Sequence, residues 1–124
     1  MNRLRQEIRS ALSELKKETS GELSARCLLP ARFIGFQGHF PDRPVLPGVC
    51  LAQVVIEAYN VLHRPARLLE IVKADFLHPV TPGETFALLI SMVPDEDGAL
   101  LLHGRICIGE KKIANLKMRI KHED

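Results

Sequence analysis

Residues 38–57, GHFPDRPVLPGVCLAQVVIE, decide the fold, because a proline-rich loop runs directly into the most apolar segment of the chain. Pro41, Pro44 and Pro47 fix their own φ and disfavour the α region for the residues before them. Residues 38–46 are therefore expected to form an ordered, non-helical loop. A helix can begin only after it, and Pro47 suits the first turn, where a missing N–H costs nothing.

The start of this helix is a place that a ligand can reach. Gly48 lets a ligand approach the backbone closely. The amides of Gly48, Val49 and Cys50 have no acceptor inside the helix and carry the positive end of its dipole. His39 precedes them in the loop, so the sequence predicts a chemical site in which a titratable imidazole lies beside a helix N-terminus.

The composition is that of an ordinary globular protein. The chain has 124 residues, 46% of them hydrophobic, which predicts one domain over residues 1–124. Seventeen basic and fifteen acidic residues leave a net charge of +2, too small to indicate nucleic acid or a membrane surface as a partner. The N-terminus shows no apolar signal region, and no run approaches the roughly 18 apolar residues of a membrane span.

The three cysteines agree with a cytoplasmic protein. Cys27, Cys50 and Cys107 are odd in number, lack a CxxC spacing and lie in apolar surroundings. This pattern indicates reduced core thiols. We therefore expect a cytoplasmic chain.

The N-terminal segment allows two interpretations. Leu4, Ile8, Leu12 and Leu15 follow one another at spacings of four, four and three, which favours an amphipathic helix over residues 2–17. Alternatively, residues 10–17 form an early strand, since 18–21 is a good turn and the alternating segment 23–29 is a plausible partner strand. Residues 31–37 are expected to form a short helical or irregular turn beneath His39.

The segment 48–62 is apolar on most sides, which predicts a buried helix. Its polar residues Gln53, Glu57 and Asn60 are spaced by four and three, so they form one stripe. For Glu57 and Asn60 we expect this stripe to be the helix edge that reaches water or a partner chain, because long polar side chains seldom stay buried without a partner.

After residue 65 the pattern changes to strands. Segments 68–76, 85–93, 99–108 and 112–121 are bounded by turn residues, with a tight hairpin turn at 109–111. We expect these four segments to form an antiparallel meander. With 23–29 they predict an α+β fold in which one central helix is wrapped by a curved antiparallel sheet of five to six strands.

Two blocks of sequence resemble a known family. His39-Phe40-Pro41-x-x-Pro44-Val45-Leu46-Pro47-Gly48-Val49 resembles the active-site loop of the hotdog-fold 3-hydroxyacyl-[acyl carrier protein] dehydratases. The block KADFLHPVTPGE, residues 73–84, is similar to the strand and turn that follow the central helix in that family. The resemblance covers residues 31 to 90 and implies a hotdog fold, with dimers that join two sheets edge to edge.

The resemblance also implies a reaction. His39 would take the proton from C2 of a 3-hydroxyacyl thioester, and the amides of Gly48 and Val49 would stabilise the charge on the carbonyl oxygen. Substrate would contact Phe40, Pro47, Gly48, Val49 and Glu57. The acyl chain would arrive on the phosphopantetheine of acyl carrier protein, the expected partner, with no other cofactor. The chain would form a homodimer, a higher even oligomer or a heterodimer with another hotdog chain.

One position departs from the family. The acid that protonates the leaving hydroxyl falls fourteen residues after His39, where this chain has Gln53. An amide donates no proton to a leaving group at ordinary pH. Four possibilities stay open: His39 acts as base and acid, Glu57 substitutes one turn later, a different hotdog chain supplies the acid, or the protein binds acyl chains without dehydrating them. A hotdog thioesterase that uses Glu57 is the rival enzyme.

The remaining histidines carry no further prediction of chemistry. His78 and His103 are expected to be structural or solvent-facing, and His63 and His122 lie beside charged residues. None forms a metal-ligand spacing with cysteine or carboxylate, so we expect no metal. The serines lack a G-x-S-x-G context, which argues against a serine hydrolase.

Overall fold

The computed structural model describes residues 2–36 and 44–123. Its elements follow one another along the chain as α1 Arg3–Ala11, β1 Leu12–Lys17, β2 Leu23–Leu28, the short 3₁₀ turn η1 Ile34–Phe36, α2 Gly48–Leu62, β3 Ala66–Phe76, β4 Thr85–Pro94, the 3₁₀ turn η2 Glu96–Gly98, β5 Leu100–Ile108 and β6 Lys111–His122.

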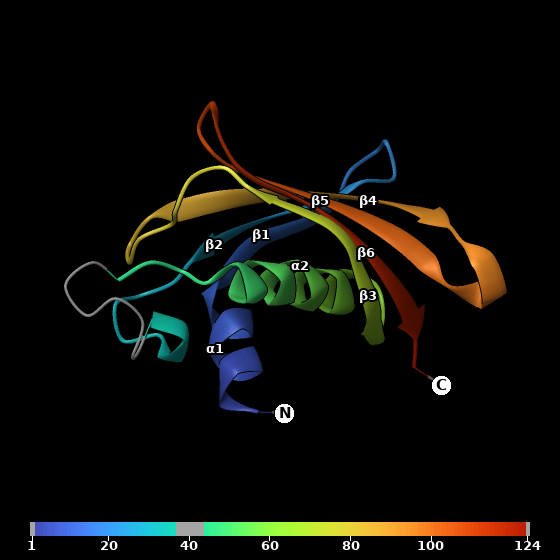
Figure 1. Cartoon of the computed structure of the whole chain (residues 1–124), viewed down its shortest axis with the longest axis horizontal. Coiled ribbons are helices and arrows are strands. Elements are labelled where there is room, and N and C mark those ends of the chain that lie inside the picture. The colour runs from blue at the N-terminus through green and yellow to red at the C-terminus, as the bar shows by residue number, and fades with distance from the viewer. Residues whose placement is uncertain (1, 37–43, 124) are drawn as a thin grey trace.

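The strands form one antiparallel sheet in the order β1-β2-β4-β5-β6-β3. The sheet arches over α2, which lies along its concave face, and α1 lies on the other side of α2 (Figure 1). The prediction of one central helix wrapped by a curved sheet of five to six strands is confirmed, with six strands in the described residues.

The core lies between α2 and the sheet. Val54, Val55 and Tyr59 of α2 are fully buried against strand residues such as Phe86 and Leu102. The helix can approach β5 closely because position 104 is glycine. A Cβ added to Gly104 would lie 3.0 Å from both Cγ atoms of Val55. Packing of this apolar helix, and not its intrinsic propensity, therefore fixes its place.

Both interpretations of the N-terminal segment are right in part. Residues Arg3–Ala11 form a helix whose first turn is capped, because the Asn2 side chain accepts a hydrogen bond from the Arg5 amide. From Leu12 the chain is extended and pairs with β2, where Leu12 lies opposite Cys27. The full helix over 2–17 is wrong, because this pairing satisfies the backbone of residues 12–17 in the sheet.

The predicted four-strand meander is wrong in one strand. β4, β5 and β6 follow as a meander, but β3 pairs with β6 at the edge of the sheet. β4 has no free side for β3, because β2 occupies one side and β5 the other. The connection at 77–84 therefore carries the chain from the β3 edge back to the middle of the sheet.

The cysteines differ in their surroundings. Cys27 and Cys50 are buried in the core, and burial raises the pKa of the Cys27 thiol to about 12. Cys107 is only half-buried and lies outside the core, so its prediction as a core thiol is wrong. In the part of the chain that the structure describes, no helix is long and apolar enough to cross a membrane.

Candidate functional site

The start of α2 holds three of the predicted site residues. Pro47 is the N-cap with extended backbone, and Gly48 and Val49 begin the first turn. Gln53 and Glu57 follow on the same helix. His39 and Phe40 lie outside the described residues, so their predicted roles stay predictions.

The first amides of α2 are presented outward. The amides of Cys50 and Leu51 donate to the carbonyl of Pro47, at 2.9 and 3.3 Å. Those of Gly48 and Val49 donate to no backbone carbonyl of the described residues. Val49 is 70% exposed, so this end of the helix is open. The two donors and the helix dipole favour negative charge here, as the predicted stabilisation of a carbonyl oxygen requires.

The two sequence blocks meet at this point. The Leu46 amide donates to the carbonyl of Val80 at 2.8 Å, which ties the loop before α2 to the turn after β3. The ring of Phe76, the last residue of β3, lies against Gly48. A Cβ at position 48 would come within 2.5 Å of the Phe76 Cζ atom. Glycine is therefore required for this close contact, independently of any ligand.

Glu57 is the centre of an ion cluster between the two helices. Its side chain is fully buried, with Arg5 Nε 2.8 Å from Oε2 and Arg9 Nε 2.8 Å from Oε1. Burial opposes ionisation, but the hydrogen bonds from Arg5 and Arg9 outweigh it and hold the pKa of Glu57 below its ordinary value. Glu57 is thus a carboxylate without a proton to donate at neutral pH.

The expectation that Glu57 and Asn60 reach water or a partner is wrong. Both are buried, and both have partners within the chain. The Asn60 side chain accepts a hydrogen bond from the Ala66 amide at 3.0 Å, which fixes the turn from α2 into β3. Arg5 and Arg9 were missed as partners of Glu57, although their spacing of four on a helix places them on one face.

Gln53 is joined to the same cluster. Its side-chain Nε2 donates to Glu57 Oε2 at 2.6 Å. Gln53 is only partly buried, and it borders a hollow of about 180 Å³ together with Ala66 and Leu68 of β3. Gln53, which the resemblance puts at the acid position, is therefore an amide whose nitrogen is already engaged.

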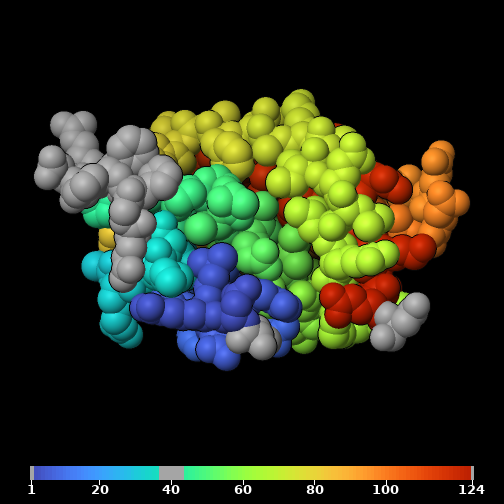
Figure 2. All heavy atoms as spheres, turned by 60° about the horizontal axis from the view of Figure 1, so that its bottom comes forward, coloured from blue at the N-terminus to red at the C-terminus, as the bar shows by residue number. Residues whose placement is uncertain are grey.

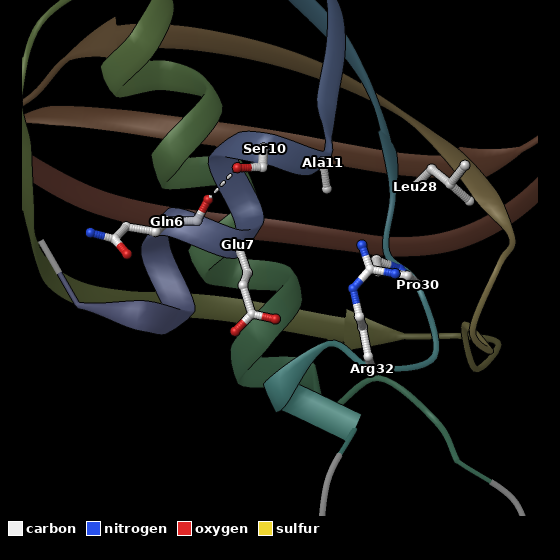
Figure 3. A pocket seen from close by; sticks show the side chains of 7 residues that line it. All are labelled: Gln6, Glu7, Ser10, Ala11, Leu28, Pro30 and Arg32. Atoms are coloured by element: carbon white, nitrogen blue, oxygen red, sulfur yellow. Dashed lines mark hydrogen bonds between the residues drawn. The ribbon is translucent and has the colours of Figure 1, made fainter.

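A larger hollow of the described residues lies elsewhere. It has a volume of about 540 Å³ between α1 and the segment that follows β2. Figure 3 shows its lining side chains, which are Gln6, Glu7, Ser10, Ala11, Leu28, Pro30 and Arg32. None is a predicted site residue, and the Glu7 carboxylate is already paired with Arg3 and the Ile34 amide. This hollow is therefore a weaker candidate than the start of α2.

The β3 edge is the second open feature near α2. Among the described strands β3 pairs only with β6, and it exposes Leu68, Leu69, Ile71, Val72 and Phe76. Beside it a strip of α2 is uncovered between β3 and α1 (Figure 2). A long apolar edge strand of this kind is a ready template for pairing with another chain.

Three rings stack where α2 ends and β6 ends. Tyr59, His63 and His122 lie at the corners of a triangle, with centroid distances of 5.3, 5.6 and 5.8 Å and nearly parallel planes. The Tyr59 hydroxyl also bonds His122 Nε2, and an Arg64 nitrogen lies 2.8 Å from His122 Nδ1. No pattern in the sequence indicated that these three rings lie together. Within residues 2–36 and 44–123, no three His, Cys, Asp or Glu side chains gather as a metal site requires.

Comparison with known proteins points to one family. Residues 15–115 match the ApeI-like family, described as ApeI dehydratase. The 3-hydroxyacyl-[acyl-carrier-protein] dehydratase FabZ of Clostridium kluyveri is 36% identical over 87 residues, 64% of this chain and 60% of that protein. FabZ of Sulfurovum sp. is 26% identical over 98 residues, 68% of this chain and 66% of that protein. The chain thus spans less than two thirds of the length of these curated relatives.

A solved structure shares the fold. A chain of the dehydratase heterocomplex ApeI:P from Xenorhabdus doucetiae has a TM-score of 0.76 with this chain at 24% identity. The match covers 90% of this chain and 96% of that one. The predicted hotdog fold is confirmed.

Proposed function

Because the chain belongs to the ApeI-like dehydratase family, we propose that it acts on 3-hydroxyacyl thioesters of acyl carrier protein and eliminates water to give the trans-2-enoyl thioester. The observation that carries the proposal is the start of α2. There the Gly48 and Val49 amides are unused by the backbone of the described residues, and the two family-like blocks meet.

The proposed reaction begins with loss of a proton from C2 to the imidazole of His39. The electron pair moves toward the thioester carbonyl, whose oxygen gains negative charge beside the Gly48 and Val49 amides. The C3–O bond then breaks, and the hydroxide leaves as water after it takes a proton. Within this chain His39, protonated in the first step, is the donor we propose, because Gln53 is an amide and Glu57 is ionised.

The acyl chain would reach this site on the phosphopantetheine of the carrier protein. Pro47 and Phe40 would contact the substrate, and no further cofactor is needed for the elimination. We place the reaction in fatty acid or polyketide-type biosynthesis, in the cytoplasm.

We further propose that the working unit contains two hotdog chains joined through β3. The apolar side chains that this edge strand exposes support the pairing. A homodimer needs only this chain. A mixed dimer with a different hotdog chain would add a carboxylic acid to the site, and Gln53 is the observation that favours it.

The test is to incubate the purified chain with a 3-hydroxyacyl carrier-protein substrate and to detect the enoyl product by mass. The chain is assayed alone and mixed with each hotdog chain of the same organism. His39→Ala should abolish turnover in every active mixture. If no mixture forms product while the substrate still binds, the chain is a non-catalytic acyl-binding subunit. If the free thiol is released instead and Glu57→Gln prevents it, the chain is a thioesterase.

A further inference from the structure

The hydrogen bond between Gln53 and Glu57 fixes which end of an amide is presented. A carboxylate only accepts hydrogen bonds, so the nitrogen of Gln53 must face Glu57. Turning the amide over would place its oxygen against the Glu57 oxygens and lose a charge-assisted bond. The oxygen Oε1 is therefore the end of Gln53 left for another donor.

The charge on Glu57 is itself fixed by α1. Arg5 and Arg9 place one guanidinium on each carboxylate oxygen, both at 2.8 Å. These two contacts stabilise the ionised form of the Glu57 carboxylate. The orientation of Gln53 thus depends on three other side chains from two helices, Glu57, Arg5 and Arg9, and on which of their groups can donate or accept.

The oxygen of Gln53 can be reached from outside. Gln53 is partly exposed, and the hollow of about 180 Å³ beside it is bounded by Ala66 and Leu68 at the start of the open β3 edge. This is the helix face that a paired chain and its acyl ligand would meet. An acyl group there would encounter an acceptor.

We propose that Glu57 is a positioning residue that turns Gln53 into a hydrogen-bond acceptor and thereby selects 3-hydroxyacyl over 3-oxoacyl thioesters. This inference rests on the proposed function. A 3-hydroxyl donates to Gln53 Oε1, whereas a 3-oxo group brings a second acceptor against it. A site built to pair with a hydroxyl rejects an analogue that lacks one. We expect the 3-hydroxyacyl group to bind about tenfold more tightly than the 3-oxoacyl group.

Glu57→Gln should reverse this arrangement. The new side chain would turn its oxygen to Arg5 and Arg9, since both only donate, and would face Gln53 with its NH₂ group. Gln53 would then offer its oxygen to position 57 and its own NH₂ to the ligand, which a 3-oxo group can accept. The preference for the hydroxyl should fall to about onefold or invert.

The experiment measures binding of two unreactive probes by calorimetry. They are 3-hydroxyacyl and 3-oxoacyl pantetheine amides of equal chain length, with nitrogen in place of the thioester sulfur. The full chain is used as wild type, Glu57→Gln and Gln53→Leu. We expect the wild type to favour the hydroxyl probe about tenfold, and both variants to lose this ratio while they still bind the probes.

The ratio of the two affinities is the decisive quantity, because a merely structural role for Glu57 would weaken both probes alike. The same ratio in the wild type and in Glu57→Gln overturns the inference and leaves the proposed function standing. If neither probe binds any variant, the proposed function fails and the inference fails with it. If Glu57→Gln does not fold, Glu57→Asp is the second variant. Its carboxylate still pairs with Arg5 and Arg9, but its shorter side chain no longer reaches Gln53, so the ratio of hydroxyl-probe to oxo-probe affinity should fall in the same way.

Discussion

Replacing Arg5 and Arg9 together by Met tests the charge on Glu57 directly. Met keeps the helix propensity of Arg, so the change removes only the two cations that lie 2.8 Å from the Glu57 oxygens. Removing one side of a buried ion pair costs about 3–5 kcal/mol. Arg5 and Arg9 are 35% and 33% exposed. Water therefore weakens these pairs already, and we expect the lower end, about 3 kcal/mol.

The double variant should also change the pH dependence of stability. In the wild type the pKa of Glu57 in the folded state lies below its ordinary value. Ionised Glu57 therefore stabilises the fold above the unfolded-state pKa of about 4.3, and this stabilisation is lost as the pH falls further. Without the arginines, burial raises the folded pKa above 4.3. Glu57 then opposes folding at neutral pH, and this opposition fades as the pH falls through the raised folded pKa.

Thermal unfolding by circular dichroism at pH 7 and pH 5 measures both effects. We expect the Tm of the double variant to fall by about 10 °C at pH 7, with a smaller deficit at pH 5. Arg3→Met is the matched control, because Arg3 pairs with Glu7 at 2.9 Å on the exposed face of the same helix. That pair should be worth no more than about 0.5 kcal/mol. A double variant as stable as the control, or equally destabilised at both pH values, would refute a buried carboxylate at Glu57.

Three further changes probe the neighbouring features. Gly48→Ala places a Cβ 2.5 Å from the Phe76 ring and should lower stability by about 1–2 kcal/mol; Phe76→Ala in the same chain should recover the loss, and a fully stable Gly48→Ala protein would contradict the contact. Burial and nearby positive charge lower the pKa of His122, so neutral His122 stabilises the fold fully above about pH 6.5 and this stabilisation is lost as the pH falls. His122→Phe should therefore flatten the decline in Tm between pH 7.5 and 5.5. An unchanged slope of Tm against pH would contradict the lowered pKa. Val72→Lys should shift the chain toward monomer in sedimentation velocity, whereas Val93→Lys, a valine of similar exposure on β4, should not.

The sequence predicted α2 with both its ends, because local rules suffice there. Pro47 stops any earlier helix, and the apolar run to Leu62 has no other place than the core. The candidate site at the start of α2 was predicted from the same stretch of sequence, residues 38–57. Five of the six strands in the described residues, β2 to β6, were also recognisable from turns and alternation.

What the sequence did not predict depends on contacts between distant segments. β3 looks like the first strand of a meander, but the pairing of β2 with β4 excludes it from that place. Glu57 looks like an exposed helix edge until α1 brings Arg5 and Arg9 against it. A polar stripe on a helix has the same pattern whether water or a second helix satisfies it, so only the packing of α1 decides between the two.

This packing bears on how the chemistry can be completed. A carboxylate one turn after the acid position invites the idea that the acid has simply moved along the helix. The charge on Glu57 contradicts that idea. Two guanidinium groups keep the carboxylate ionised, and the Gln53 side chain donates a third hydrogen bond to it. In the proposed dehydration, a proton for the departing oxygen therefore has two sources left, the imidazole that would accept it or an acid on a second chain. Gln53→Glu separates them: it would set a second carboxyl beside Glu57, where the two must share a proton, and would give a homodimer an acid donor besides His39.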